Sequence, residues 1–281
     1  MRDVALVTFA EFPDGYEDDH LLAGALTRRG LSVEFVCWDD PSARWPAARI
    51  AVVRSTWDYF GRVDAFCDWA DYVGSVTTLC NDAATIRWNS HKRYLLDLAA
   101  LGVPVVPTRL VRAGEVVAIG PGRHVVKPAV SGGAERTTRF ASQDDLDALV
   151  ATDDALVQPY LEAIETVGEL SIMCIAGVPS HVVRKVPALG DFRTQEHHGA
   201  DIVAAELTDA QRALAGTAFG ALREIGLDPR PLYARVDAVE VDGELQIMEL
   251  ELIEPTLWLG WHPPAAAVLA EAIEGQLTHS A

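Results

Sequence analysis

Long apolar runs and basic residues are both scarce in this sequence of 281 residues. No apolar stretch is long enough to cross a bilayer, so we expect no membrane-spanning segment. The 23 Lys and Arg residues are outnumbered by 41 Asp and Glu residues. The formal net charge of −18 argues against nucleic acid or an anionic membrane as a partner. A nucleotide can still bind where local cations offset this charge.

Cysteines and targeting signals are also few. The four cysteines have no paired spacing, which indicates buried thiols in a reducing cytoplasm rather than a disulfide framework. Residues 1–10 read as a strand followed at once by acidic residues, so we expect no signal peptide and a cytoplasmic location.

Two common nucleotide-binding motifs are absent. No G-x-G-x-x-G follows the first predicted strand, which disfavours a dinucleotide fold, and no G-x-x-x-x-G-K-[ST] occurs anywhere. Any ATP must therefore be held by something other than a P-loop.

Strand and helix patterns alternate over about the first ninety residues. This alternation predicts an open parallel sheet with crossover helices, in which ligands lie beyond the carboxyl ends of the strands. The predicted strands are residues 4–9, 31–38, 49–53 and 77–79. Arg54 and Asp58 follow the third strand, where they suit the carboxylate and the amino group of a small amino-acid-like substrate. The adjacent Trp57 and Tyr59 fit a position at the edge of this site and packing in the core equally well.

Residues 235–255 read as two strands joined by a tight turn at Asp242-Gly243. Glu249 and Glu251 are two residues apart, so both carboxylates emerge on one face, and a hairpin brings Asp237 beside them. Three such carboxylates repel one another unless a cation lies between them, and oxygen ligands of this kind suit Mg²⁺ shared with substrate phosphates. The alternative is a solvated acidic face. The apolar flanking residues and the nearby Arg235 favour the metal.

Two lysines and a glycine-rich loop stand in the middle of the chain. Lys127 ends an apolar strand, and Ser131-Gly132-Gly133 follows it closely. Loop glycines let backbone N–H groups approach an anion, so this segment suits phosphates. Lys92 opens a predicted helix, a position that is also typical of a surface residue.

In combination, these motifs resemble the ATP-grasp superfamily of carboxylate–amine ligases. They occur in that family's order over roughly residues 75–260, and the preceding sheet is similar to the family's N-terminal domain. The motifs are Lys92, Lys127 with its Gly-rich loop, Gln158-Pro159-Tyr160-Leu161, Arg193-Thr194-Gln195, Arg235-x-Asp237 and Glu249-x-Glu251.

This resemblance implies an α/β (α+β) ATP-grasp fold whose two subdomains clamp ATP and Mg²⁺. It implies a Rossmann-like substrate-side domain over residues 1–88, a small subdomain with the Gly-rich loop over 89–165, and a subdomain with the metal-binding hairpin over 166–281. Two motifs depart from the family pattern. Glu251 and Gln195 stand where asparagine is usual, and Ala200 replaces a glycine.

The resemblance also implies roles for single residues. Nucleotide-binding roles fall to Lys92, Lys127, Ser131, Gly132, Gly133, Gln158, Tyr160, Leu161, Glu169 and Lys185, with Glu169 at the ribose. Catalytic roles fall to Arg235, Lys127 and Arg193, metal binding to Asp237, Glu249 and Glu251, and substrate binding to Arg54, Asp58 and Arg193.

More narrowly, three strings resemble the D-cycloserine synthetases, which are O-ureido-D-serine cyclo-ligases of antibiotic biosynthesis. The strings are Ser55-Thr56-Trp57-Asp58-Tyr59, Gly190-Asp191-Phe192-Arg193 and residues 249–255. The resemblance implies that ATP activates a carboxylate as an acyl phosphate and that a nitrogen of the same molecule then closes a ring. It leaves a homodimer open as the oligomeric state.

Two other functions fit the same motifs. One is a ligase that joins an amino acid to a separate amine, and the other is a non-catalytic nucleotide sensor, which the acidic cluster disfavours. The sequence identifies no general base. His181, His197 and His198 are candidates, but each is more often a solvated or packed histidine.

Overall fold

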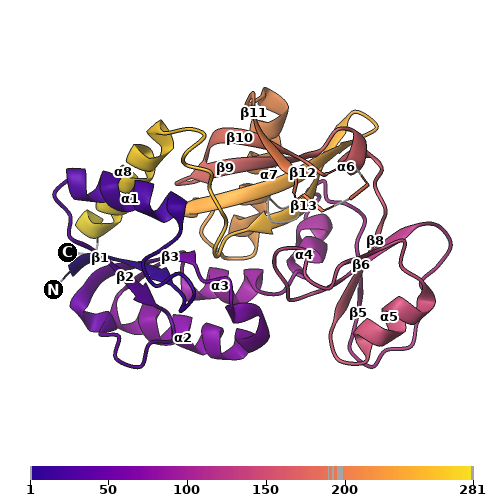
Figure 1. The fold of residues 1–281 in the computed structure, drawn as a ribbon, viewed down its shortest axis with the longest axis horizontal. Coiled ribbons are helices and arrows are strands. Elements are labelled where there is room, and N and C mark those ends of the chain that lie inside the picture. The colour runs from indigo at the N-terminus through magenta and orange to yellow at the C-terminus, as the bar shows by residue number, and fades with distance from the viewer. Residues whose placement is uncertain (1, 189, 192, 195–198, 280–281) are drawn as a thin grey trace.

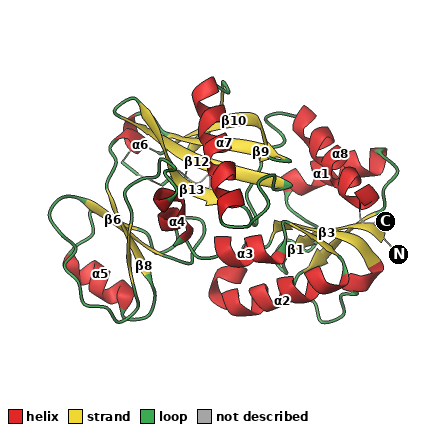
Figure 2. Cartoon of the chain, turned by 180° about the vertical axis from the view of Figure 1, so that it is seen from behind, coloured by secondary structure: helices red, strands yellow, loops and turns green. Residues whose placement is uncertain are grey.

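The computed structural model describes residues 2–188, 190–191, 193–194 and 199–279, which fold around three β-sheets (Figure 1). The first sheet and a small sheet lie at opposite ends of the long axis of the molecule, with the largest sheet between them (Figures 1 and 2). This architecture confirms the predicted mixed α/β fold.

The first sheet is parallel, as the sequence predicts, and its strand order is β2-β1-β3-β4. Its strands are β1 (Arg2–Thr8), β2 (Val33–Cys37), β3 (Ala48–Ser55) and β4 (Thr78–Cys80), and its helices are α1 (Glu17–Arg28), α2 (Val63–Val76) and α3 (Ala83–Asn89), with short 3₁₀ turns η1 (Trp45–Ala47) and η2 (Tyr59–Arg62). Alternate residues of β1 face opposite sides. Val4 and Leu6 pack in the same cluster as α1, whereas Ala5 and Val7 pack in the same cluster as α2.

The last helix, α8 (Pro264–His279), returns to this first sheet and lies beside α1 (Figures 1 and 2). Leu269 and Ile273 share an apolar cluster with Leu22 of α1 and Leu6 of β1. The predicted boundary at residue 166 groups α8 with the C-terminal subdomain, whereas its contacts join it to the first sheet.

The small sheet is antiparallel with strand order β5-β8-β6-β7. Its strands are β5 (Arg109–Val111), β6 (His124–Pro128), β7 (Thr138–Arg139) and β8 (Ala155–Pro159); α4 (Tyr94–Ala100) precedes the sheet and α5 (Gln143–Val150) packs on it. Helix α5 begins with a capping box, in which Ser142 Oγ accepts from the Asp145 N–H at 3.2 Å and Asp145 Oδ2 accepts from the Ser142 N–H at 2.7 Å.

The largest sheet is antiparallel with strand order β11-β10-β9-β12-β13. Its strands are β9 (Glu169–Ile175), β10 (Val178–Val186), β11 (Asp201–Ala205), β12 (Tyr233–Val241) and β13 (Glu244–Glu251), accompanied by α6 (Ala163–Thr166) and α7 (Asp209–Glu224). Strands β12 and β13 form the predicted hairpin. Positive φ values at Asp242 (53°) and Gly243 (82°) make its two-residue turn of the type that right-twisted strands favour.

The two faces of this sheet differ in chemistry because side chains alternate along each strand. Val236 and Leu250 belong to the apolar cluster that includes α4 and α7 residues. Asp237, Glu249 and Glu251 line a cavity instead. The fold thus carries a row of charged side chains on a strand face backed by a hydrophobic core.

Candidate functional site

A cavity of about 950 Å³ is bordered by residues of the two antiparallel sheets and by the segments that follow β1 and β3 of the first sheet. Its volume is at the upper end of the range for small-molecule sites, enough for a nucleotide and a second small ligand. The charged row of the largest sheet, the Gly-rich loop and the loops that follow β1 and β3 all contribute to its walls.

Lys127 on β6 and Lys92 just before α4 both reach the carboxylate of Glu249. Lys127 Nζ lies 2.7 Å from Oε1 and Lys92 Nζ lies 3.4 Å from Oε2. Partial burial opposes ionisation of Glu249, but the two lysines outweigh it and hold its pKa at about 2. Lys92 Nζ also donates to the Ser131 carbonyl oxygen at 2.6 Å, which fixes the Gly-rich loop beside both ammonium groups. This arrangement can bind a phosphate chain.

The Gly-rich loop lies against the N-terminal part of the protein. Ser131, Gly132 and Gly133 all line the cavity. A Cβ atom added at Gly132 would lie 2.2 Å from Cζ of Phe60, which follows β3. Any side chain at this position would therefore have to displace the Phe60 ring, which lies in the 3₁₀ turn after β3.

An apolar slot adjoins the lysines. Leu161 and Gln158 line it, in contact with a small cluster that includes Val106 and Met248. Gln158 Nε2 donates to Thr108 Oγ1 at 2.8 Å. A flat, weakly polar base fits such a slot. Tyr160, predicted to bind the nucleotide, is not among the described cavity residues, and its ring contacts Phe140 at a centroid distance of 4.5 Å and Glu165 through its hydroxyl.

Buried charges form a connected network behind the lysines. Lys185 Nζ contacts Glu169 and lies 3.5 Å from Asp237 Oδ1, and Thr194 Oγ1 donates to Glu169 Oε2 at 2.6 Å. Burial raises the pKa of Glu169 even though Lys185 opposes the shift. Glu169 lines the cavity, so its prediction as a ribose ligand stays open, with Lys185 and Thr194 as its present partners.

Arg235 is held by two carboxylates. Its Nε and Nη2 donate to Asp237 at 2.9 and 2.8 Å, and Nη2 also reaches Glu251. Burial disfavours the ionised form of Asp237, but Arg235 and Lys185 outweigh it, so the pKa lies below its ordinary value. Arg235 compensates the charge of Glu251 less fully, and burial therefore raises the pKa of Glu251 to about 7. The guanidinium is thereby oriented at the cavity wall.

The three predicted metal ligands lie on one face, since the hairpin pairs Asp237 with Glu249 and Arg235 with Glu251. The expectation that the carboxylates simply repel one another is incomplete, because each contacts a cationic side chain. Within the described residues, no three His, Cys, Asp or Glu side chains could hold a metal ion. Mg²⁺ usually takes one or two carboxylates together with water and substrate phosphates, and the donors present fit that mode. The three assignments stay predictions.

The predicted substrate residues all have protein partners. Arg54 is 3% exposed, donates to Asp19 Oδ1 at 3.0 Å and to the Pro255 carbonyl oxygen at 3.1 Å, and is not among the described cavity residues. Asp58 lines the cavity but accepts from Trp38 Nε1 at 2.8 Å and contacts Arg62. This geometry favours a structural part for Arg54.

Arg193 does line the cavity. Its Nη2 lies 2.7 Å from Asp191 Oδ2. Its predicted roles in catalysis and in substrate binding stay predictions. To bind Arg193, a ligand would have to replace Asp191 as its ion-pair partner.

His181, the one candidate general base within the described residues, is not among those that line the cavity. His181 Nε2 lies 2.8 Å from the Leu257 carbonyl oxygen, so this nitrogen carries the proton and His181 supports a loop. Burial lowers the pKa of His181. His197 and His198 lie outside the described residues.

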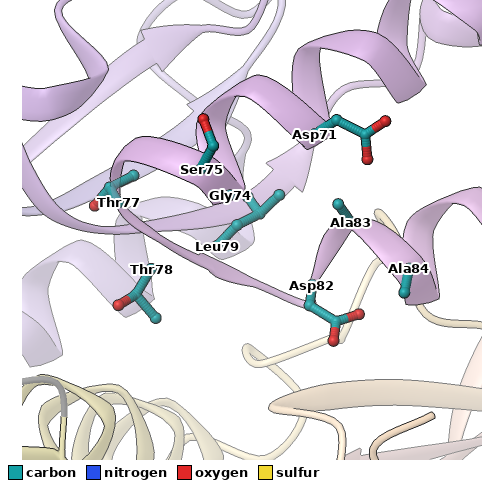
Figure 3. Close-up of a pocket in the computed structure, with 9 residues that line it drawn as sticks. All are labelled: Asp71, Gly74, Ser75, Thr77, Thr78, Leu79, Asp82, Ala83 and Ala84. Atoms are coloured by element: carbon teal, nitrogen blue, oxygen red, sulfur yellow. The ribbon is translucent and has the colours of Figure 1, made fainter. Parts of the chain in front are cut away.

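A second, shallower hollow lies between α2, β4 and α3 (Figure 3). Apart from Leu79, its lining residues are small, hydroxyl-bearing or acidic. Asp82 Oδ1 accepts from the Thr85 N–H at 2.8 Å as the cap of α3, and Asp71 Oδ2 lies 2.5 Å from Arg87. Both carboxylates have structural partners, and the hollow offers no group suited to phosphate or acyl chemistry.

Two segments of the chain match known protein families, and both contribute residues to the large cavity. Residues 4–81 match the N-terminal domain of D-cycloserine synthetase DcsG, and residues 119–256 match the ATP-grasp domain of prokaryotic glutathione synthetase. The chain is also 32% identical over 308 residues to the cycloserine biosynthesis protein DcsG of Streptomyces lavendulae, with 99% of each chain covered. The chain belongs to the D-cycloserine synthetase family. It is therefore an ATP-dependent carbon–nitrogen ligase of the ATP-grasp type.

Solved structures agree with this D-cycloserine synthetase family assignment. The crystal structure of D-cycloserine synthetase DcsG superposes with a TM-score of 0.86 at 30% identity, covering 98% of this chain and 99% of that one. D-Alanine–D-alanine ligase from Bacillus anthracis, solved in complex with ATP, has a TM-score of 0.69 at 12% identity and shows the shared fold alone. The ATP-grasp family uses ATP and a divalent metal. None of the described helices has the length and apolar character that crossing a bilayer requires.

The structure adds one residue to the D-cycloserine synthetase site that the sequence analysis missed. Trp258 lines the cavity with φ of 45°, and its ring lies 5.1 Å from the guanidinium carbon of Arg235 and 5.7 Å from Lys185 Nζ. Such contacts with an aromatic face help to hold cations in place. The positive φ that places the ring is not visible in the sequence, where Trp258 is one tryptophan in an apolar loop.

Proposed function

We propose that this protein is an ATP- and Mg²⁺-dependent cyclo-ligase that acts in the cytoplasm and converts O-ureido-D-serine into D-cycloserine. The full-length match to a cycloserine biosynthesis protein carries the proposal, and the charged cavity supports it. In this proposal residues 1–88 form the substrate side, 89–165 cover the nucleotide, and 166–281 supply the metal and transfer site.

The nucleotide-binding step follows from the cavity chemistry. The base enters the apolar slot at Leu161 and Met248, and the phosphates lie at Lys92 and Lys127 under the Gly-rich loop. When bound, Mg²⁺ at the hairpin carboxylates supplies positive charge against the phosphates. Glu249 exchanges its lysine partners for this new arrangement.

The first chemical step is phosphoryl transfer. An oxygen of the substrate carboxylate bonds to the γ-phosphorus, and ADP leaves with the electrons of the broken P–O bond. Arg235, already oriented by Asp237, Glu251 and the Trp258 ring, offsets charge on the transferring oxygens. The product is an acyl phosphate.

The second step closes the ring. The ureido nitrogen attached to the substrate oxygen forms a C–N bond to the activated carbonyl carbon. Phosphate leaves with the electrons of the C–O bond, and the nitrogen loses one proton. Water then cleaves the carbamoyl group from this nitrogen, which releases carbon dioxide and ammonia and leaves the N–H of D-cycloserine. Intramolecular attack gains a large effective concentration when the substrate is held folded with the reacting atoms about 3–3.5 Å apart.

The test is an incubation of the protein with ATP, Mg²⁺ and O-ureido-D-serine as the only amino acid, analysed by mass spectrometry. D-Cycloserine formed with stoichiometric ADP is the expected result. The match of residues 119–256 to a glutathione synthetase domain favours one competitor, an intermolecular ligase. Absence of ADP with this substrate, together with turnover of an amino acid plus a separate amine, would establish that competitor instead.

A further inference from the structure

The cavity has different chemistry at its two ends. Its cationic side chains all come from beyond residue 90 among the residues described. They are Lys92, Lys127, Lys185, Arg193 and Arg235. The loops that follow β1 and β3 contribute aromatic and acidic side chains to the lining and, within the same described set, no cation. The part of the lining beyond residue 90 also carries the carboxylates that pair with these cations, among them Glu169, Asp237, Glu249 and Glu251.

Three rings at the N-terminal end form what we call the aromatic corner, made of Phe12, Tyr16 and Trp57. The centroid distances are 5.7 Å for Phe12–Tyr16, 5.7 Å for Phe12–Trp57 and 5.0 Å for Tyr16–Trp57. The corresponding interplanar angles are 87°, 80° and 73°, so the three planes are close to mutually perpendicular. All three residues line the cavity and are only partly buried.

The aromatic corner is fixed by the protein itself. Trp57 Nε1 donates to the Glu254 carbonyl oxygen at 3.0 Å, and Thr8 Oγ1 donates to the Phe12 carbonyl oxygen at 2.6 Å. Phe9, which is 7% exposed, packs behind both Phe12 and Trp57. The rings thus need no ligand to reach this arrangement.

We propose that the aromatic corner binds the α-ammonium group of an amino-acid substrate, a group that takes no part in ring closure. This inference rests on the proposed function and names the subsite for the non-reacting end of its substrate. A cation is attracted to the faces of aromatic rings, most strongly to tryptophan. Glu11, which is next to Phe12 and exposed, adds negative charge at the rim. The carboxylate of the same molecule then points toward Arg235, which also lines the cavity.

This subsite replaces the roles predicted for two other residues. Arg54 and Asp58 were natural candidates for gripping the charged ends of an amino acid, yet each is already engaged with protein groups. The hydrogen bonds that hold Phe12 and Trp57 use a backbone carbonyl and the indole N–H, which leaves their ring faces to other contacts.

The test compares two substrates that differ only at the α-carbon: O-ureido-D-serine and the analogue with hydrogen in place of its amino group. We expect the unaltered protein to prefer the first by at least about tenfold in kcat/KM. Trp57→Leu and Phe12→Leu should each reduce this preference by about 3- to 10-fold, mainly through KM for the amino acid, with KM for ATP unchanged. Phe12→Tyr, which keeps an aromatic face, should retain it.

Tyr72→Leu is the matched control, because Tyr72 is 52% exposed on α2 and does not line the cavity. Equal losses for both substrates in Trp57→Leu and Phe12→Leu would make the rings a plain apolar wall and overturn the inference. If the unaltered protein still forms ADP and D-cycloserine from O-ureido-D-serine, that result refutes the subsite and leaves the proposed function standing. Absence of ADP release by the unaltered protein would refute the proposed function and the subsite with it.

Discussion

Replacement of Asp237 by asparagine should destabilise the nucleotide-free protein. Asp237 is 2% exposed, accepts from Arg235 at 2.8 and 2.9 Å, and has Ser171 and Lys185 as further neighbours. Asparagine keeps the shape and one acceptor oxygen but leaves both buried cations with less compensation. Loss of one partner from a buried pair costs about 3–5 kcal/mol, and the retained acceptor places this substitution near the lower limit, at about 3 kcal/mol.

The free energy of unfolding of both proteins can be measured by chemical denaturation without nucleotide or divalent metal. Glu251→Gln is the matched control from the same face of the hairpin, because its side chain is 27% exposed and its pKa of about 7 leaves it partly protonated already. We expect this control to lose less than about 1 kcal/mol. Unchanged or increased stability of Asp237→Asn would refute the reasoning and indicate that repulsion among the carboxylates dominates.

Three further changes test other parts of the site. Lys127→Ala should weaken ATP binding about 10- to 100-fold by calorimetry, since a charge-assisted phosphate contact contributes roughly 1.5–3 kcal/mol, and unchanged affinity would contradict the assignment. Arg54→Ala should lower stability by about 3 kcal/mol in denaturation experiments, whereas a selective rise in KM for the amino acid at full stability would restore its predicted substrate role. Burial and Glu251 raise the pKa of Glu254 to about 8, so between about pH 5 and 8 the folded protein binds a proton that the unfolded chain has lost. Its contribution to stability therefore falls as pH rises, and Glu254→Gln should remove that part of the pH dependence in denaturation series at several pH values.

The sequence predicted the parts of the fold whose signals are local. The turn at Asp242-Gly243 and the alternation around it predicted the hairpin and the shared face of Glu249 and Glu251, because both depend only on neighbours in the chain. The parallel first sheet followed from strand and helix periodicity in the same way. Short strands such as β7 (Thr138–Arg139) were missed, since two residues carry no periodic signal.

The parts that depend on distant partners could not be predicted from patterns. Arg54 looked available for substrate because nothing in the sequence shows that Asp19, 35 residues earlier, pairs with it inside the protein. The carboxylates of the hairpin looked uncompensated because Lys127 and Lys185 reach them from other strands. Pairing of buried charges is decided by the tertiary fold, and only the fold shows which candidate side chains remain accessible to a ligand.

The return of α8 to the first sheet has a consequence for how the chain can be made and divided. The apolar cluster on one side of the first sheet includes Leu269 and Ile273, which are synthesised last, so this cluster stays incomplete until nearly the whole chain has left the ribosome. A fragment ending near residue 81 would match a recognised family domain and yet expose that apolar face to water. The matched domain, residues 4–81, is thus smaller than the apolar cluster that covers the first sheet. A chimaera that carries the first sheet into another ligase would therefore need α8 as well.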